Sequence, residues 1–306
     1  MNATHSEPAI INRVHPSGGI RLTNAQTGII LVLPALALFA IVILFPLLNS
    51  MYMGLLERHL IFGGDEFVWT KNINRILERN FVDLLGTTLR FTVGATLLPF
   101  VLGFATALFL NAPIAGRGIL RGLFLLPWLV PSVVVSFLWM WIFNANYGVI
   151  NGVLRSSQLI TENINFLGSD TTAMWAVIIA KSWNTFPWIA VMILAGLQTI
   201  PSELYEVASI DGANRLQQFW HITVPQLRGV ITTVLLLSFI WNFQHFETLY
   251  VMTTGSYGTT TFAVAVYQEA FEAFDLGRAG AIGILWMGLL SIVVGIYLYF
   301  GMSEDS

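Results

Sequence analysis

The stretch ELYEVASIDGANRLQQFWHITVPQL, from Glu203 to Leu227, lies between two of the most apolar segments of this 306-residue chain. It places three carboxylates, a central glycine and a proline within one short interval. Apolar runs flank it on both sides, near 173–197 and 229–250. A polar interval between two runs of that length indicates a loop that connects two membrane-spanning helices.

The composition of the whole chain agrees with this interpretation. Hydrophobic residues make up 56% of the sequence and charged residues only 10%, with a mean hydropathy of +0.72. A bilayer core of about 30 Å needs ~20 mostly apolar residues per helix, and the sequence supplies six segments of that kind. They lie near 28–52, 87–110, 119–143, 173–197, 229–250 and 277–300. We therefore predict an all-α membrane protein with six transmembrane helices.

Several classes of protein are excluded by composition. The chain has no cysteine, which excludes disulfides, cysteine-ligated zinc, iron–sulfur clusters and thiol nucleophiles. The formal net charge of −3 is too small to indicate a nucleic-acid partner. No GxxxxGK[ST] sequence is present, so the chain has no phosphate-binding loop of its own. The five histidines form no metal-ligand spacing and no catalytic triad, so we expect neither an enzyme nor a metal site.

The segments define the domain organisation. Residues 1–27 are polar and interrupted by prolines and glycines, which predicts a tail; residues 28–300 form the six-helix domain, with a long loop over 198–228, and residues 301–306 form a second tail. The 54–86 loop is long enough to fold as a small cap on the outer side. Among the shorter loops, four arginines fall on the side of the amino terminus and one on the other. Since basic loops stay inside, we predict a cytoplasmic amino terminus.

The 198–228 loop has a predictable shape. Pro201 and Ser202 open a short helix, Asp211 is the predicted N-cap of a second helix, Gly212 allows a turn between them, and Pro225 ends the second helix. Apolar side chains such as Leu204 and Val207 lie among the acidic ones. A helical hairpin of this kind either packs on its own bundle or docks on a partner.

The spacing within the loop carries a family resemblance. Glu206, Ala208, Gly212, Ile222 and Pro225 resemble the EAA loop of the permease subunits of binding-protein-dependent ABC importers, with Val207 in place of the usual alanine. The surrounding sequence is similar to the maltose-type branch, whose solutes are mostly sugars and sugar derivatives. The similarity extends to LVLPALALFAIVILFPLL (31–48), RGLFLLPWLVPSVVVSFLWMWIFNANYGVINGVL (121–154) and FETLYVMTTG (246–255). The stretch TTGSYGTTT departs from the family's usual Gly-Gly-Pro.

The resemblance implies a type I importer fold and a set of partners. The short helix of the loop would be the coupling helix, docked on a cytoplasmic ATPase dimer that binds the ATP, through Glu206, Ala208, Asp211 and Gly212. The other implied partners are a homologous second permease, an extracytoplasmic solute-binding protein and the lipid of a bacterial inner membrane. This chain itself would need no cofactor.

Polar residues inside the predicted spans are candidates for the solute site, because such residues are costly in a membrane and by default functional. On helical spacing they form one stripe on each of two helices. The stripes are Lys181, Asn184, Thr185 and Trp188 in the fourth span, and Ser238, Asn242 and His245 in the fifth. In the resembling family these regions contact the solute, and tryptophans could stack on sugar rings. The alternative is that they join helices, as serine, threonine and asparagine commonly do.

Lys181 leaves the charge of the solute open. An ammonium about 12 Å deep needs a compensating charge, from the solute or from Glu247. The first case predicts an anionic sugar derivative, and the second predicts a Lys181–Glu247 pair around a neutral sugar. Two other functions also remain. An ion-coupled secondary transporter would be built from inverted repeats, of which none is visible, and a non-transporting scaffold would not need a polar layer in its core.

Overall fold

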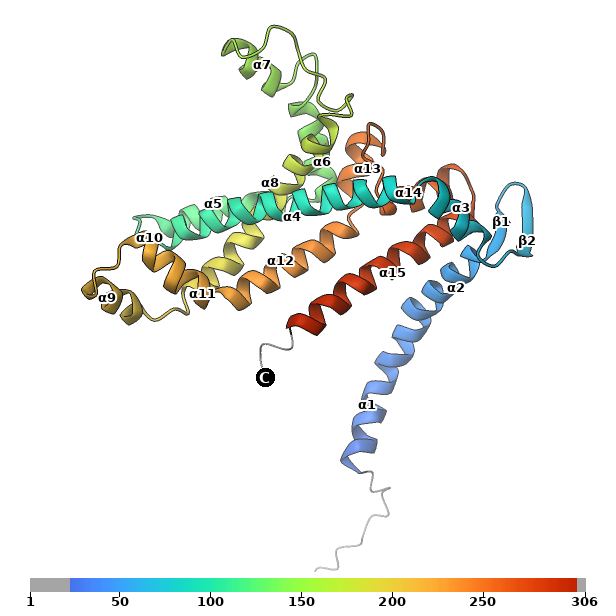
Figure 1. The fold of residues 1–306 in the computed structure, drawn as a ribbon, viewed down its shortest axis with the longest axis horizontal. Helices are drawn as coiled ribbons and strands as arrows, with labels where there is room; N and C mark the ends of the chain where they lie inside the picture. The colour runs from blue at the N-terminus through green and yellow to red at the C-terminus, as the bar shows by residue number, and fades with distance from the viewer. Residues whose placement is uncertain (1–22, 302–306) are drawn as a thin grey trace, which may run out of the picture. The chain divides into compact units, whose positions relative to one another are not determined.

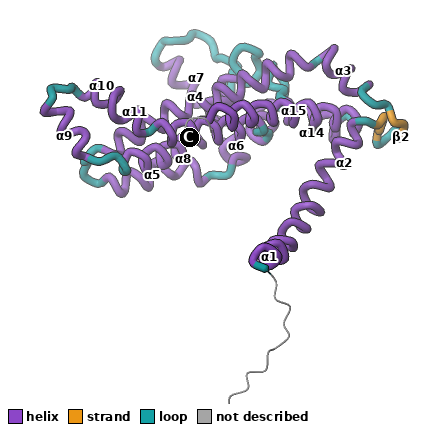
Figure 2. The backbone as a smooth tube through the Cα atoms, turned by 60° about the horizontal axis from the view of Figure 1, so that its bottom comes forward, coloured by secondary structure: helices purple, strands orange, loops and turns teal. Residues whose placement is uncertain are grey.

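The computed structural model describes residues 23–301, and over this range the chain is mostly helical (Figure 1). Strand appears in the described part as a single short hairpin (Figure 2). The chain divides into two compact units, one ending at residue 49 and the other beginning at residue 50. The predicted tail over 1–27 lies mostly outside the described residues, as does the tail over 301–306 apart from its first residue.

The described residues of the first unit form one long apolar helix. It comprises α1 (Asn24–Phe39), a π-helical turn (Ala40–Leu44) and the first half of α2 (Phe45–Gly54). Thr23 caps it, because its side chain accepts from the Gln26 backbone N–H while the Gln26 side chain accepts from the Thr23 N–H. Residues 26–54 are long and apolar enough to cross a membrane, which confirms the first predicted span.

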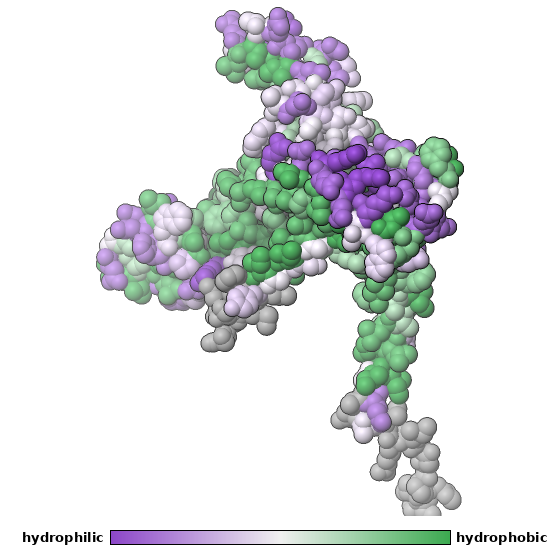
Figure 3. Space-filling model, turned by 45° about the vertical axis from the view of Figure 1, so that its right-hand side comes forward, coloured by the Kyte–Doolittle hydropathy of each residue, from purple (hydrophilic) through white to green (hydrophobic). Residues whose placement is uncertain are grey.

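The second unit is built around two long helices that pack against each other, α4 (Phe81–Asn111) and α8 (Ala173–Leu197). Phe91 and Ala95 of α4 and Val177 of α8 are fully buried in the contact. Helix α8 has the predicted bounds, and α15 (Leu276–Gly301) begins one residue before the predicted sixth span. Figure 3 shows a broad hydrophobic surface over the middle of this unit, as a lipid-facing helix bundle requires.

Two of the six predicted spans are interrupted. The third consists of α5 (Arg117–Leu129) and α6 (Ser132–Ile142), bent by 93° at Val130 and Pro131. A proline has no N–H to continue a helix, which explains the break. The fifth, predicted over 229–250, is α12 (Arg228–Phe243) followed by the separate helix α13 (Glu247–Thr253). Each of these two predicted spans therefore consists of two helices and not of one continuous helix.

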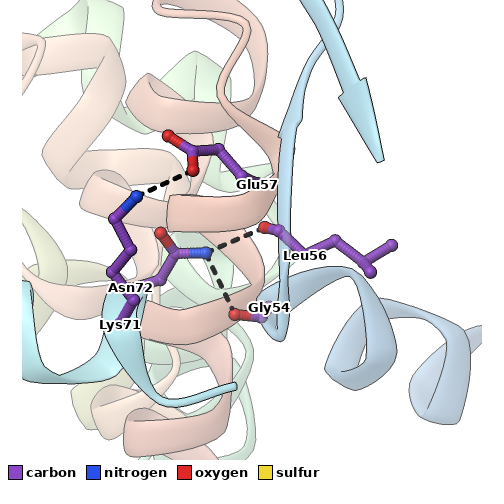
Figure 4. A network of polar contacts seen from close by, with 5 residues as sticks. All are labelled: Gly54, Leu56, Glu57, Lys71 and Asn72. Carbon is purple, nitrogen blue, oxygen red and sulfur yellow. Dashed lines mark hydrogen bonds and ion pairs between the residues drawn. The ribbon is translucent and has the colours of Figure 1, made fainter. Parts of the chain in front are cut away.

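The predicted cap over 54–86 is a folded element. It contains β1 (Leu56–His59), β2 (Gly63–Phe67) and α3 (Lys71–Arg79). The buried Asn72 amide donates to the carbonyls of Gly54 (3.2 Å) and Leu56 (2.9 Å), and Lys71 pairs with Glu57 at 2.8 Å (Figure 4). One side of α3 thereby holds the end of α2 and the start of the hairpin.

The remaining elements are short. Helix α7 (Val149–Ser156) follows α6, and α14 (Phe262–Tyr267) with a π-helical turn η3 (Gln268–Glu272) precedes α15. The loop between α8 and α12 contains α9 (Ser202–Ile210), α10 (Arg215–Gln218), the π-helical turn η2 (Phe219–Thr223) and α11 (Val224–Gln226). The 198–228 interval is thus the helical hairpin that its sequence predicts.

Candidate coupling loop and solute site

The hairpin turns at Gly212, as predicted, but its capping residues differ from the prediction. Pro201 precedes the first helical residue, Ser202, and Asp211 is the C-cap of α9. Gly212 has a φ of +84°, and the Ala213 N–H donates to the Ala208 carbonyl at 2.8 Å. This is the hydrogen bond of a glycine-terminated helix end. The N-cap of α10 is Asn214, paired reciprocally with Gln217, so the prediction of Asp211 as an N-cap is wrong.

The predicted coupling residues come together on the surface of this hairpin. Glu206, Asp211 and Gly212 are exposed, and Ala208 is half-buried. Ala208, Asp211 and Gly212 share the wall of a 310 Å³ cleft with residues of α10 and η2. Two apolar side chains beside them also face outward, Val207 at 57% and Ile210 at 85% exposure. Figure 3 shows hydrophobic and hydrophilic side chains mixed over this lobe. Such a surface suits a protein partner.

Hydrogen bonds across the hairpin hold its two arms together. The Tyr205 hydroxyl lies 2.9 Å from the Thr223 hydroxyl, and the Gln218 amide donates to the Ser209 hydroxyl at 2.8 Å. The same amide also donates to the Ala213 carbonyl at 3.2 Å. These residues could not be identified from the sequence, because a tyrosine or glutamine in a loop gives no signal of its partner. These hydrogen bonds tie the two arms of the hairpin to each other.

In the predicted solute stripe on α8, Asn184 contacts the break in the third span. Its side-chain amide donates to the carbonyls of Pro127 (2.7 Å) and Val130 (3.1 Å). At the bend the Pro127 carbonyl also accepts a long hydrogen bond from the Val130 N–H (3.4 Å), and Asn184 supplies further donors that a membrane interior cannot. Thr185 and Trp188 are half-buried on the same helix, and the Trp188 ring lies 4.9 Å from the Trp241 ring.

Lys181 lies in an ionisable cluster with groups from the fifth span. It is half-buried and interacts electrostatically with Glu247 and with His245. Glu247 accepts a hydrogen bond from the Ser132 hydroxyl at the start of α6. The cluster therefore joins α8 to the two points where the third and fifth spans are interrupted. Proline residues 127 and 131 are the sequence signal that could have located this junction.

The predicted solute residues of the fifth span lie in two different places, two of them on α12 and one beyond its end. Ser238 and Asn242 are buried on α12, at 1% and 2% exposure, and the Asn242 amide donates to the Ala95 carbonyl (2.9 Å) and the Thr96 hydroxyl (3.2 Å) of α4. His245 lies beyond the end of α12, so the prediction that it shares a helical face with the other two is wrong. Its Nε2 is 2.8 Å from the Thr248 hydroxyl, and its ring stacks on Phe91.

The structure thus gives two of the predicted solute residues a role within the chain. Asn184 and Asn242 both join helices by hydrogen bonds, as the alternative interpretation expected. Lys181 and His245 lie together near Glu247, and Trp188 lies against Trp241. The hydroxyl of Ser238 and the carbonyl oxygen of Asn242 have no hydrogen-bond partner in the described part of the chain. Contact of any of these residues with a solute stays a prediction.

The fold defines a multi-pass membrane protein with an exposed helical hairpin between α8 and α12. Residues 99–304 match the family described as the binding-protein-dependent transport system inner membrane component. The chain belongs to this family. The resemblance inferred from the loop is therefore confirmed.

Curated relatives align with nearly the whole chain. It is 34% identical over 286 residues to the trehalose/maltose transport system permease protein MalF of Thermococcus litoralis, covering 92% of this chain and 96% of the relative. It is 31% identical to the sulfoquinovosyl glycerol transport system permease protein SmoG of Agrobacterium fabrum, covering 93% of each chain.

Solved structures establish the fold. A bacterial ABC transporter involved in the import of the acidic polysaccharide alginate superposes with a TM-score of 0.78 at 20% identity, covering 92% of this chain and 96% of that chain. The same transporter in complex with a periplasmic protein that carries an alginate pentasaccharide gives a TM-score of 0.77 at 20% identity, covering 89% and 93%. The prediction of an ABC importer permease fold is confirmed.

Proposed function

We propose that this chain is the permease subunit of an ATP-driven importer that takes up a sugar or sugar derivative delivered by an extracytoplasmic binding protein. The observation that carries the proposal is the exposed α9–Gly212–α10 hairpin, which presents acidic and apolar side chains around an open turn. Transport energy enters there from a cytoplasmic ATPase dimer, and the chain has no nucleotide site of its own.

The proposal includes partners and an orientation in the membrane. The permease pairs with a homologous second permease, because a single bundle of this size cannot enclose a path for a polar solute. The hairpin faces the cytoplasm, the amino terminus lies on the same side, and the 54–86 cap faces the binding protein. The membrane is the bacterial inner membrane.

The solute class is supported by the relatives, whose names include trehalose, maltose and sulfoquinovosyl glycerol. These names cover both a neutral sugar and a sulfonated derivative. Lys181 interacts with Glu247 inside the chain, so a compensating carboxylate is already present. This favours a neutral sugar. The residues proposed to meet it are Lys181, Thr185, Trp188 and His245, while Asn184, Ser238 and Asn242 shape the wall behind them.

The coupling role is tested on the purified complex reconstituted in lipid. Gly212→Leu places a side chain at a φ of +84°, in the middle of the docking surface, and Glu206→Lys reverses a charge there. Both variants should assemble but lose the ATP hydrolysis that loaded binding protein stimulates. Gly152→Leu is the control, since this glycine of α7 is also exposed with open space around it. Normal stimulation and uptake in both hairpin variants would refute the proposal.

ATP dependence separates this function from its alternatives. Uptake into vesicles driven by an ion gradient without ATP would indicate a secondary transporter. Absence of uptake in a complex with all its subunits would indicate a scaffold.

A further inference from the structure

A small cavity lies where four elements of the second unit meet, at the end opposite the α9–α10 helical hairpin. Its volume is 100 Å³, and its walls come from α3, the start of α4, the α14–η3 segment and the start of α15. Its polar lining includes Arg75, Arg79, Gln268, Glu269 and Arg278. Figure 3 shows strongly hydrophilic side chains gathered over this end of the unit.

The lining carries an excess of positive charge. Arg278 and Glu269 form an ion pair at 2.9 Å, with side-chain exposures of 33% and 17%. Arg75 and Arg79 are one turn apart on α3, and neither forms an ion pair with a carboxylate of residues 23–301. Three guanidinium groups of the lining therefore face one carboxylate of the lining, Glu269, and Asp275 is a further carboxylate close to it. Arg75 interacts electrostatically with Glu57 without forming an ion pair, and Glu57 is already paired with Lys71.

The ion pair leaves hydrogen-bonding capacity unused inside the cavity. Arg278 Nε and Glu269 Oε2 are buried and have no partner in the described part of the chain. A buried N–H without an acceptor costs free energy of desolvation. A ligand that supplies an acceptor oxygen to this N–H removes that cost and so binds more tightly. Burial raises the pKa of Glu269, while Arg278 opposes this rise and Asp275 adds to it.

The cavity lies at the level where two membrane-spanning helices begin. Arg79 is the last residue of α3, two positions before α4 starts, and Arg278 is in the first turn of α15. Both α4 and α15 are apolar enough to span a bilayer. Leu77 and Val82, on either side of Arg79 in sequence, are exposed at 44% and 76%. This combination of cations with neighbouring apolar side chains is typical of the headgroup layer.

We propose that this cavity binds the phosphate of an anionic phospholipid, with Arg75, Arg79 and the Nε of Arg278 donating to its oxygens. Guanidinium groups are the side chains best matched to phosphate, because their planar N–H groups meet two oxygens at once. The volume is well below the roughly 300–1,000 Å³ of usual small-molecule pockets, so it suits one headgroup phosphate rather than the transported solute. The bound lipid joins α3 to α15.

The test uses the full chain in its purified complex. The delipidated complex is titrated with phosphatidylglycerol, and lipid retention is measured by native mass spectrometry together with the change in Tm. Arg75→Gln/Arg79→Gln should weaken retention by at least roughly tenfold, since one charge-assisted hydrogen bond is worth about that factor. Arg79→Gln alone, at an exposed position, should give a smaller loss without affecting folding. Arg155→Gln is the control, an exposed arginine in the last turn of α7.

Three outcomes would overturn the proposal. The first is equal lipid retention by the wild type and the double variant. The second is a rise in Tm with inorganic phosphate alone and no further rise with lipid, which would assign the site to a free anion. The third is weaker docking of the binding protein in the double variant with unchanged lipid retention, which would assign the arginines to a protein interface.

Discussion

Gly54 and Gly280 bring the backbones of α2 and α15 into direct contact. A Cβ atom on Gly280 would lie 2.5 Å from the Gly54 nitrogen, and one on Gly54 would lie 2.7 Å from the Ala281 nitrogen. Both atoms in the way belong to backbone, so no side chain can move aside. The crossing is of the small-residue type that membrane helices use for close packing.

Gly280→Ala should therefore destabilise the permease by about 1–3 kcal/mol, the usual cost of forcing atoms into a well-packed contact. Gly283→Ala on the same helix is the control, because its Cβ would meet nothing within 4 Å. The measurement is the Tm of each variant by size-exclusion chromatography after heating. Equal Tm values for the two variants would show that the close approach is unimportant.

The Asn72 side chain predicts a second stability effect. Asn72→Ala leaves the Gly54 and Leu56 carbonyls without their donor, which should cost about 1–3 kcal/mol because both lie at a buried junction. Asn74→Ala removes the same type of side chain from an exposed position two residues along α3 and should be nearly neutral. Thermal unfolding of both variants, with protease sensitivity of the 54–86 cap, is the measurement. A neutral Asn72→Ala variant would contradict the assigned role.

The two lysines of the chain offer a matched pair for testing the solute site. Lys181→Gln removes the cation beside Glu247 and should lower assembly and stability while leaving the ratio of neutral to anionic sugar uptake unchanged. Lys71→Gln, at an exposed position, should change neither uptake nor selectivity. Uptake of labelled neutral and anionic sugars is the measurement. Selective loss of anionic uptake in Lys181→Gln would instead show that the solute supplies the counter-charge.

The Glu57–Lys71 pair predicts a pH effect at the cap. The hydrogen bond and charge of Lys71 hold the pKa of Glu57 below its usual value of 4.5. A carboxyl whose pKa is lower in the folded state stabilises the fold above its unfolded pKa, and this stabilisation is lost as pH falls through the folded pKa. Because both side chains are exposed, solvent screens the pair and the effect on stability should be small.

The measurement is the carboxyl carbon chemical shift of Glu57 from about pH 2 to about pH 6, a window that extends further below the usual value of 4.5 than above it because the pKa is lowered. In Lys71→Gln the midpoint should rise toward the usual value. Glu66, on the other strand of the hairpin, is the internal control. A midpoint unchanged by the substitution would show that Lys71 does not govern the titration.

Local sequence determined the membrane-spanning helices and the turn of the α9–α10 helical hairpin. The bounds of α8 follow from a long, mostly apolar run between two polar loops, since a span must satisfy its backbone internally. Pro201 and Gly212 mark the start and end of α9 because their effect on the backbone is local. The N-cap of α10 was assigned wrongly because Asp211 and Asn214 are both good caps three residues apart, and the helix-ending bond at Gly212 decides between them.

Only the tertiary structure decided what the polar side chains in the spans do. Asn184 meets carbonyls 54 and 57 residues away, and Asn242 meets α4 across 147 residues. Arg75, Arg79 and Arg278 share a cavity although some 200 positions separate α3 from α15. Helical periodicity gives the face of a residue but not what that face meets, because partners so distant in sequence are chosen by packing. A stripe of polar residues on one face of a helix is therefore equally consistent with a solute site and with a contact to another helix.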